Sequence, residues 1–472
     1  MPQYGGGTET KMNNGIWNIL DYGAVSSEEV NQSKAIQKAI DDCQKHGGGT
    51  VIVPEGRYLT GDIRLRSNVT LYLQKNAQLI GSRNPMDYFN HLNDTCEPLS
   101  ESQITDAPYV HLSTIHGETK YDENKSEYRF KRIPASRWNN ALIRAIDAVN
   151  VGITGEEGSL IDGNNCFDAQ GEELYRGPHA ITFFNCKNVE LKGYTVVNSA
   201  NWAHNLLYCD NIKVENITVN AGHDGFDASV CNNLTISDSA FYTGDDCIAG
   251  FGNVNVLVDN CILNSSCSAL RFGGTNVVVK QCHIFGPGKY GFRGAMTDKE
   301  KSESAPSSEL AGRNMLSAFT YYSDYSLPVC VQPGNIIISD CKIENADRFL
   351  HYNFSGNETW QRNRPLKDIT FKNIDAAGIS MPLTAYGDET VKFDLSLENV
   401  NIEIRKGYED IDLINACNFN TIKLKNVRVK NLSGECMVRT WSDGNVTAEN
   451  VLSDNAKHLV LKAKKAFFAE SI

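Results

Sequence analysis

Two features that the 472-residue sequence lacks exclude large classes of protein. No run of 18 apolar residues occurs, so we expect no membrane-spanning helix and no membrane partner. Basic residues are outnumbered by acidic ones, 45 against 57, and the net charge is −12. Nucleic acids are bound by clustered Lys and Arg, so we expect no nucleic-acid partner. An acidic ligand would need a local basic pocket. The sequence gives no indication of oligomeric state.

Metal-site and targeting patterns are also absent. The 14 cysteines form no CxxC pair and no metal-finger spacing, so we expect reduced, buried thiols. The opening segment MPQYGGGTETKMNNG contains no apolar stretch of the kind found in signal peptides. A cytoplasmic location is therefore expected if the chain is complete, and a secreted or periplasmic one if the chain was trimmed.

What the sequence does contain is a repeat of about 22 residues. Segments with alternating apolar residues begin at asparagines that are 23, 22, 22 and 21 residues apart: Asn188, Asn211, Asn233, Asn255 and Asn276. Such a period, with β-branched residues and no helix between the strands, predicts an all-β, right-handed parallel β-helix of about ten coils. The asparagines suit bends with a left-handed backbone, where copies on neighbouring coils can bond to one another as a ladder.

The segments outside the repeat predict a cap and two loops on one β-helix domain, residues 1–472. SKAIQKAIDDCQK, from Ser33, has one apolar face and is followed by Gly47–Gly49. We expect this helix to cap the N-terminal end of the stack within residues 17–60. Residues 96–140 and 295–333 break the period, and we expect long loops there.

Three aspartates recur within one repeat. The segment HDGFDASVCNNLTISDSAFYTGDDC, residues 223–247, contains Asp224, Asp245 and Asp246. Because residues i and i+22 lie on neighbouring coils, Asp224 should stack on Asp246, with Asp245 beside them and then Ser268 and Tyr290 on later coils. Close carboxylates repel, so one should keep its proton near neutral pH. An acid beside a base is what glycosidic cleavage needs.

The same period predicts a second column beside the carboxylates. It contains Asp227, Ala249, Arg271 and Arg293, each 22 residues after the last. The two arginines are candidates for binding an acidic or densely hydroxylated group of a substrate. Trp202, in NSANWAH, is either a platform for stacking on a sugar ring or a coil corner.

Several of these segments together resemble glycoside hydrolase family 28, the polygalacturonase-like group of pectin-active β-helix enzymes. The resemblance spans roughly residues 17–460 and includes NILDYGAV, GGGTVIVPEGRYLTG, ITGEEGSLIDG, HDGFD and GDDC. It implies that Asp245 is the general acid and that Asp224 and Asp246 hold and deprotonate the attacking water. It also implies inversion at the anomeric carbon, no metal and no cofactor.

The sequence departs from that family beside the carboxylates. His223 precedes Asp224 where the family has Asn-Thr-Asp, and Ser268 stands in place of the histidine of Gly-His-Gly. In GFRGA, Arg293 matches the family's arginine, but Ala295 replaces its lysine. The missing groups normally contact the uronate. We therefore expect hydrolysis of a pectin-type or related uronate- or deoxysugar-containing oligosaccharide, with exo action as one form, and place His223, Ser268, Tyr290, Trp202 and Asp227 beside the arginines as substrate contacts.

Two other readings stay open at this point. A β-helix lyase or epimerase could use Arg271 or Arg293 to abstract a proton, with the aspartates holding Ca²⁺. A carbohydrate-binding β-helix without turnover is the second. The three carboxylates favour hydrolysis over both.

Overall fold

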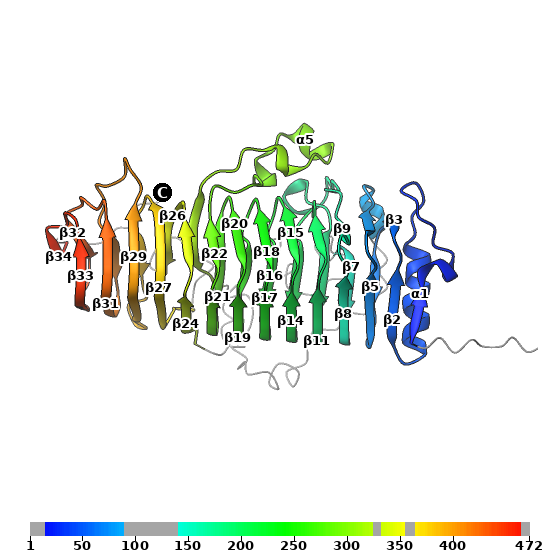
Figure 1. Cartoon of the computed structure of the whole chain (residues 1–472), viewed down its shortest axis with the longest axis horizontal. Coiled ribbons are helices and arrows are strands. Elements are labelled where there is room, and N and C mark those ends of the chain that lie inside the picture. The colour runs from blue at the N-terminus through cyan, green and yellow to red at the C-terminus, as the bar shows by residue number, and fades with distance from the viewer. Residues whose placement is uncertain (1–14, 89–139, 324–331, 355–363, 464–472) are drawn as a thin grey trace, which may run out of the picture.

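The computed structural model describes residues 15–88, 140–323, 332–354 and 364–463. Short strands cross its long axis like rungs, from α1 at the N-terminal end to β34 at the other (Figure 1). All the strand pairings are parallel and join each coil to the next, as between β11 and β14. The fold is a right-handed parallel β-helix, the handedness that parallel crossovers almost always take.

The first of three sheets along the stack holds fourteen strands, so the cylinder is longer than the ten or so coils expected. In order of pairing they are β1 (Ile16–Asn18), β2 (Gly49–Val53), β5 (Val69–Leu73), β8 (Val149–Gly155), β11 (Lys187–Lys192), β14 (Asp210–Glu215), β17 (Asn232–Ser237), β19 (Ile248–Asp259), β21 (Ser268–Lys280), β24 (Gly334–Ser339), β27 (Asp368–Ile379), β29 (Phe393–Ile404), β31 (Phe419–Lys430) and β33 (Asn445–Ser453).

The second sheet follows the asparagine bend. It contains β3 (Gly56–Thr60), β6 (Ala77–Gly81), β9 (Leu160–Asp162), β12 (Thr195–Val197), β15 (Thr218–Ala221), β18 (Ala240–Thr243), β20 (Ile262–Ser265), β22 (His283–Phe285) and β25 (Lys342–Glu344). The long strands β27, β29, β31 and β33 turn the corner and supply its last members.

The third sheet bears the predicted site. Its strands are β4 (Ile63–Leu65), β7 (Ala141–Ile146), β10 (His179–Phe184), β13 (His204–Leu207), β16 (Phe226–Ser229), the first parts of β19 and β21, β23 (Met315–Tyr321), β26 (Ala346–Asn353), β28 (Leu383–Tyr386), β30 (Ile414–Cys417), β32 (Cys436–Thr440) and β34 (His458–Lys462). Side chains alternate between the buried interior and the outer face, as strands require.

The predicted asparagine ladder is present on the first sheet. Each side-chain amide after the first donates to the asparagine of the coil before it, over 2.8 to 3.2 Å, along the series Asn68, Asn150, Asn188, Asn211, Asn233, Asn255, Asn276 and Asn335. All eight have φ between 50° and 61°. Asparagine tolerates this left-handed backbone and also bonds along the stack, which explains why it marks the repeat.

The predicted cap helix is α1 (Ser33–Lys45), beside the short helix η1 (Ile19–Tyr22). Ile36, Ala39, Ile40 and Cys43 face the first coils and are buried. The expected cap segment already includes coil strands, because β2 pairs with β5. Within the described residues, no helix is long and apolar enough to cross a membrane. The cysteines of this part of the chain are free thiols, nearly all buried.

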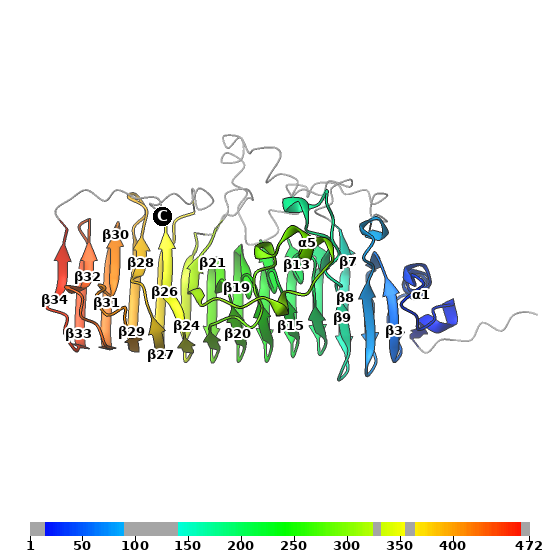
Figure 2. The ribbon, with the colours of Figure 1, turned by 90° about the horizontal axis from the view of Figure 1, so that it is seen from above.

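The second predicted loop is shorter than expected. After β22 the chain leaves the cylinder and forms η6 (Arg293–Ala295), α5 (Asp298–Ser302) and η7 (Ser307–Glu309), and then returns as β23. This excursion lies over the strands between β13 and β20 (Figures 1 and 2). The segment 96–140 falls almost wholly outside the described residues. Two more short helices, η2 (Pro85–Tyr88) and η5 (Glu172–Leu174), follow β6 and β9.

Candidate active site

The three predicted carboxylates meet at the entry to the third sheet. Asp224 lies in the turn before β16, and Asp245 and Asp246 lie in the turn before β19. The Asp246 N–H donates to Asp224 Oδ1 over 3.3 Å, and the Ser268 N–H donates to Asp246 Oδ1 over 3.1 Å. The predicted stacking of Asp224, Asp246 and Ser268 on successive coils is therefore present.

A sharp bend brings adjacent Asp245 and Asp246 into one site. A Cβ at Gly244 would lie 2.2 Å from the Gly291 carbonyl oxygen, so only glycine fits there. The Asp245 carbonyl accepts from Thr243 Oγ1 and Ser265 Oγ, each at 2.6 Å, which fixes the turn. Carboxylate oxygens of Asp245 and Asp246 and the Cys267 sulfur lie within 4.8 Å of one another.

The turn that carries Asp224 is held from the interior by His204. Its Nδ1 lies 3.0 Å from the Gly225 carbonyl and Nε2 lies 3.0 Å from the Tyr194 hydroxyl. A carbonyl only accepts, so Nδ1 carries the proton and Nε2 accepts. Burial lowers the pKa of His204 to about 4, so the ring is neutral.

Burial and mutual repulsion make the cluster retain protons. Burial raises the pKa of Asp246 to about 7, and the charge of Asp245 adds to this, while Arg271 opposes it. The pKa of Asp224 is raised well above its ordinary value, first by burial and then by Asp245, Asp246 and Asp227. Asp245 is only half-buried. The cluster thus combines two buried carboxyls of raised pKa with one that solvent reaches.

Arg271 stands at the open edge of this cluster. Its Nη1 lies 3.8 Å from Asp246 Oδ2, its guanidinium carbon lies 4.1 Å from the centre of the Tyr322 ring, and its side chain is 32% exposed. The sheet register places Asp227, Ala249 and Arg271 on consecutive strands, as the repeat predicts. Asp227 is buried and accepts from Ser229 Oγ.

Arg293 and Tyr290 do not lie in their predicted columns. The strand after β21 in the third sheet is β23, so Thr320 follows Arg271 and Ser317 follows Ser268. Because the excursion interrupts the cylinder, a residue 22 positions further along the sequence no longer lies on the next coil. Arg293 is fully buried in η6, where its guanidinium donates to the carbonyls of Ala200 and Asn165 over 3.2 and 2.8 Å. It supports the wall and has no surface to offer a substrate.

His223 and Trp202 also lie in the wall and not on its surface. His223 is 0% exposed, between the rings of Tyr175 and Phe292 at 5.9 and 5.7 Å. Burial lowers its pKa well below the usual value, and Arg176 adds to this. Trp202 is buried against His179. Both side chains are thus buried in this structure, and their contact with substrate stays a prediction.

Two family descriptions match this chain. Residues 108–269 match Glycosyl hydrolases family 28, and residues 16–86 match Rhamnogalacturonase A/epimerase, pectate lyase-like. The first match includes all three carboxylates. A probable polygalacturonase of Vitis vinifera is 27% identical over 243 residues, which are 49% of this chain and 43% of the relative. Over this part the chain is similar to polygalacturonases. An exo-poly-alpha-D-galacturonosidase of Dickeya chrysanthemi is 27% identical over 261 residues, 50% of this chain and 42% of that one.

The chain spans less than half the length of these two curated relatives. Along its whole length it is similar to the crystal structure of a hyperthermoactive exopolygalacturonase from Thermotoga maritima. The TM-score is 0.59 at 19% identity, over 93% of this chain and 91% of the other. At this identity the similarity establishes the shared fold.

Sequence reasoning missed Arg176, which lies beside the carboxylate cluster. Its guanidinium donates to Glu173 Oε2 over 3.0 Å and to Asn201 Oδ1 over 3.2 Å, and its charge lowers the pKa of Asp224 against the larger effect of burial. Arg176 comes from an irregular segment between β9 and β10, where no repeat could have placed it. Cys267 was also missed, because its cluster with Asp245 and Asp246 depends on the bend.

Proposed function

We propose that the chain is a glycoside hydrolase that cleaves a pectin-type or related uronate- or deoxysugar-containing oligosaccharide, with inversion and without a metal. The observation that carries this proposal is the group of three stacked carboxyls. Two of them are buried and have raised pKa values, and a half-buried one is beside them. Hydrolysis of a glycosidic bond needs a carboxyl that gives up a proton and another that accepts one.

The proposed role of each carboxyl follows from how far solvent reaches it. Asp245, which solvent reaches, donates its proton to the leaving oxygen as the glycosidic C–O bond breaks. Asp224 and Asp246 hold a water whose oxygen bonds to the anomeric carbon from the opposite face and whose proton passes to one of them. This arrangement requires about 6.5 to 9.5 Å between acid and base carboxyls, with the water between them. Carboxylate oxygens of Asp245 and Asp246 lie within 4.8 Å of each other, below that range, so the proposal assigns the proton-accepting role to Asp224 on the neighbouring coil.

Arg271 is proposed to bind the substrate's acidic group. It is the arginine of the predicted pair that stays partly exposed, and it lies beside Asp246 and on the face of Tyr322. A planar guanidinium matches a carboxylate by two parallel hydrogen bonds. A uronate next to the scissile bond would therefore be oriented by Arg271 while the carboxyl cluster acts on the bond.

The test is incubation of the whole chain with polygalacturonate and its oligomers, followed by mass analysis of the products. Hydrolysis adds one water to each cleaved bond, and the Asp245→Asn variant should form far less product from these substrates. A chelator should leave the rate unchanged. Products that are lighter by one water and carry a double bond would instead establish a lyase, and binding without any product would establish a carbohydrate-binding role. The first products, single units or a range of lengths, distinguish exo from endo action.

A further inference from the structure

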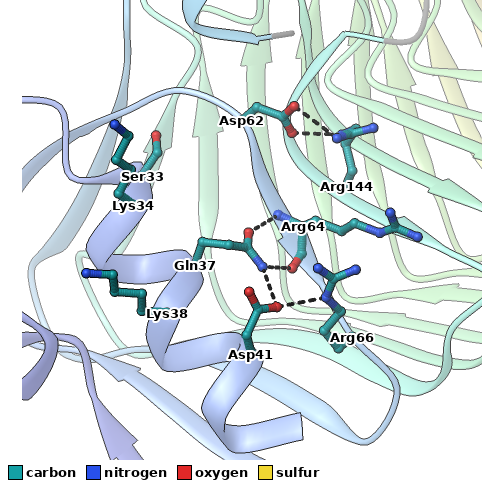
Figure 3. Close-up of a pocket in the computed structure, with 9 residues that line it drawn as sticks. All are labelled: Ser33, Lys34, Gln37, Lys38, Asp41, Asp62, Arg64, Arg66 and Arg144. Atoms are coloured by element: carbon teal, nitrogen blue, oxygen red, sulfur yellow. Dashed lines mark hydrogen bonds and ion pairs between the residues drawn. The ribbon is translucent and has the colours of Figure 1, made fainter. Parts of the chain in front are cut away.

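Two arginines on the outer face of the third sheet are held in different ways. Arg144, on β7, donates to both carboxylate oxygens of Asp62 over 2.7 and 2.9 Å (Figure 3). Arg271, on β21, lies further along the same row of the sheet, and its guanidinium carbon is 4.1 Å from the centre of the Tyr322 ring. Its Nη1 lies 3.8 Å from Asp246 Oδ2, which is longer than a normal hydrogen bond. The face of an aromatic ring therefore supports the arginine at the candidate active site.

Tyr322 belongs to a small apolar cluster that is separate from the core of the cylinder. The cluster lies where the chain leaves the third sheet for the first: at the end of β13, just after β16, within β19 and just after β23. Its buried members are Leu207, Val230, Phe251, Val254 and Tyr322. Because Tyr322 is only 6% exposed, the packing of this corner fixes the place of its ring.

A glycine lets two rings of this cluster meet across a coil. The register places Phe251, Gly273 and Tyr322 at matching positions of three successive coils, each directly after a paired residue. A Cβ at Gly273 would lie 1.9 Å from the Tyr322 carbonyl oxygen, so a side chain there would displace Tyr322. The centres of the Phe251 and Tyr322 rings are 5.5 Å apart and the ring planes stand at 86°, the edge-to-face arrangement that aromatic pairs favour. Phe251 thus fixes the plane of the ring on which Arg271 lies.

The ring gives Arg271 a support that does not vary with the protonation of the carboxyl cluster. Burial raises the pKa of Asp246 to about 7, so near neutral pH its attraction for Arg271 is present in only part of the molecules. The electron-rich face of an aromatic ring attracts a cation without taking part in this titration. An arginine that is held before the substrate arrives also loses less conformational freedom on binding it. Tyr322 therefore keeps the guanidinium ready whether or not Asp246 is ionised.

We propose that Tyr322 is a positioning residue for the substrate: backed by Phe251, its ring holds the guanidinium of Arg271 in the orientation that binds a carboxylate of the sugar chain. The inference rests on the proposed function, in which Arg271 binds the acidic group. It assigns Tyr322 no part in proton transfer. Because the ring acts on the substrate through Arg271, its removal should weaken binding only while Arg271 is present.

The experiment is a double-mutant cycle on Tyr322 and Arg271, which isolates the coupling between two residues in contact. The variants are Tyr322→Leu, Tyr322→Phe, Arg271→Met and Tyr322→Leu/Arg271→Met. Binding of a short oligogalacturonate is measured by calorimetry in the Asp245→Asn background, and kcat and KM are measured with Asp245 intact. The matched control is Tyr408→Leu, which removes a ring 5.6 Å from the Arg405 guanidinium, after β29 and several coils away from Arg271.

We expect Tyr322→Leu to bind the oligogalacturonate about 5- to 10-fold more weakly and to raise KM by a similar factor, with kcat little changed. Tyr322→Phe keeps the ring face and should change binding by less than about 2-fold, as should the control Tyr408→Leu. In the Arg271→Met background, Tyr322→Leu should add less than about 2-fold, because the ring then has no guanidinium to hold. A methyl-esterified oligomer, which offers Arg271 no charge, should not distinguish Tyr322→Leu from the native chain.

Three results would overturn the inference. They are unchanged binding by Tyr322→Leu, a loss of the same size in the Arg271→Met background, and a Tyr322→Phe variant as weak as Tyr322→Leu, which would assign the effect to the hydroxyl. Thermal unfolding shows whether each variant is folded. If Tyr322→Leu is not, Phe251→Leu takes its place, because it keeps the Tyr322 ring and removes only its backing. Binding about 3-fold weaker is then expected, and unchanged binding would also overturn the inference.

The same data separate this inference from the proposed function. Hydrolysis by the native chain, without coupling between Tyr322 and Arg271, would reject the positioning role alone. An absence of hydrolysis, together with oligogalacturonate binding that depends on both residues and shows the coupling, would reject the enzyme assignment and keep the positioning role.

Discussion

At the scale of the residue, the proposed mechanism gives each of the three carboxyls a different part in the reaction. Asp245→Asn removes the proposed acid, so turnover of substrates with poor leaving groups should fall by at least about 100-fold, the usual size of a general-acid effect. Activated aryl glycosides should lose much less, because their leaving groups depart with little protonation. Asp246→Asn should lose activity on both. Equal losses for Asp245→Asn on the two kinds of substrate would contradict its role as acid.

The buried carboxyl Asp246 also makes stability depend on pH. Its pKa is 3.8 as a free side chain and about 7 in the fold, so the native state holds a proton that the unfolded chain releases between these values. This contribution to stability is complete below about pH 4 and is lost as the pH rises through about 7. Asp246→Asn removes the dependence.

The free energy of unfolding of the native chain should therefore fall relative to that of Asp246→Asn as the pH rises from 4 to 8. The expected change in the difference is a few kcal/mol, at about 1.4 kcal/mol per pKa unit. Denaturant unfolding at several pH values measures the difference. Exposed Asp21, changed to Asn, is the control and should show no comparable trend. If the difference in unfolding free energy between Asp246→Asn and the native chain stays constant with pH, burial does not disfavour the charge of Asp246.

Replacement by Met should affect activity at one of the two arginines and stability at the other. Arg271→Met should lower kcat/KM at least about 30-fold, about 2 kcal/mol, with little change in stability. Arg293→Met leaves the carbonyls of Ala200 and Asn165 buried without their donors and should destabilise the fold by about 1 to 3 kcal/mol for each unpaired group. Kinetics and thermal unfolding of both variants test these roles. Unchanged kinetics for Arg271→Met would show that Arg271 does not bind the substrate.

At the scale of the element, the asparagine ladder should show two separable contributions. Asn233 donates to Asn211, accepts from Asn255 and has φ of 54°. Asn233→Ala loses the bonds and strains the backbone by about 1 to 2 kcal/mol, whereas Asn233→Gly loses only the bonds. The alanine variant should be the less stable by about 1 kcal/mol in denaturant unfolding. Equal stability would show that the left-handed bend contributes little.

The strands, the ladder and α1 were predictable because each rests on local periodicity. Asn188 to Asn276 mark bends that need a left-handed residue, and the apolar face of Ser33–Lys45 needs a partner surface. The stacking of Asp224, Asp246 and Ser268 followed directly, since a constant coil length converts spacing into contact. The predicted positions of Arg293 and Tyr290 were wrong because the excursion after β22 changes the coil length. The 22-residue period contains no signal of this change.

At the scale of the whole molecule, the stack is longer than predicted because its outer coils lack the regular spacing. Strands β2 to β9 and β27 to β33 follow the same path with coil lengths away from 22 residues. The burial of two site residues was the other feature that the sequence did not predict. His223 and Trp202 occupy suitable positions in sequence, yet both side chains are buried. Side-chain direction at a bend depends on the packing of the excursion and of η5, which the repeat does not contain.

The central claim is that water, held by Asp224 and Asp246, attacks the anomeric carbon opposite a leaving group that Asp245 protonates. The most direct test is proton NMR of an α-linked oligogalacturonate during the first minutes of hydrolysis, before mutarotation. Inversion predicts that the first-formed product is the β-anomer, with the α-anomer appearing only later. A first-formed α-anomer would require a retaining mechanism with carboxyls about 5 Å apart and would contradict the account.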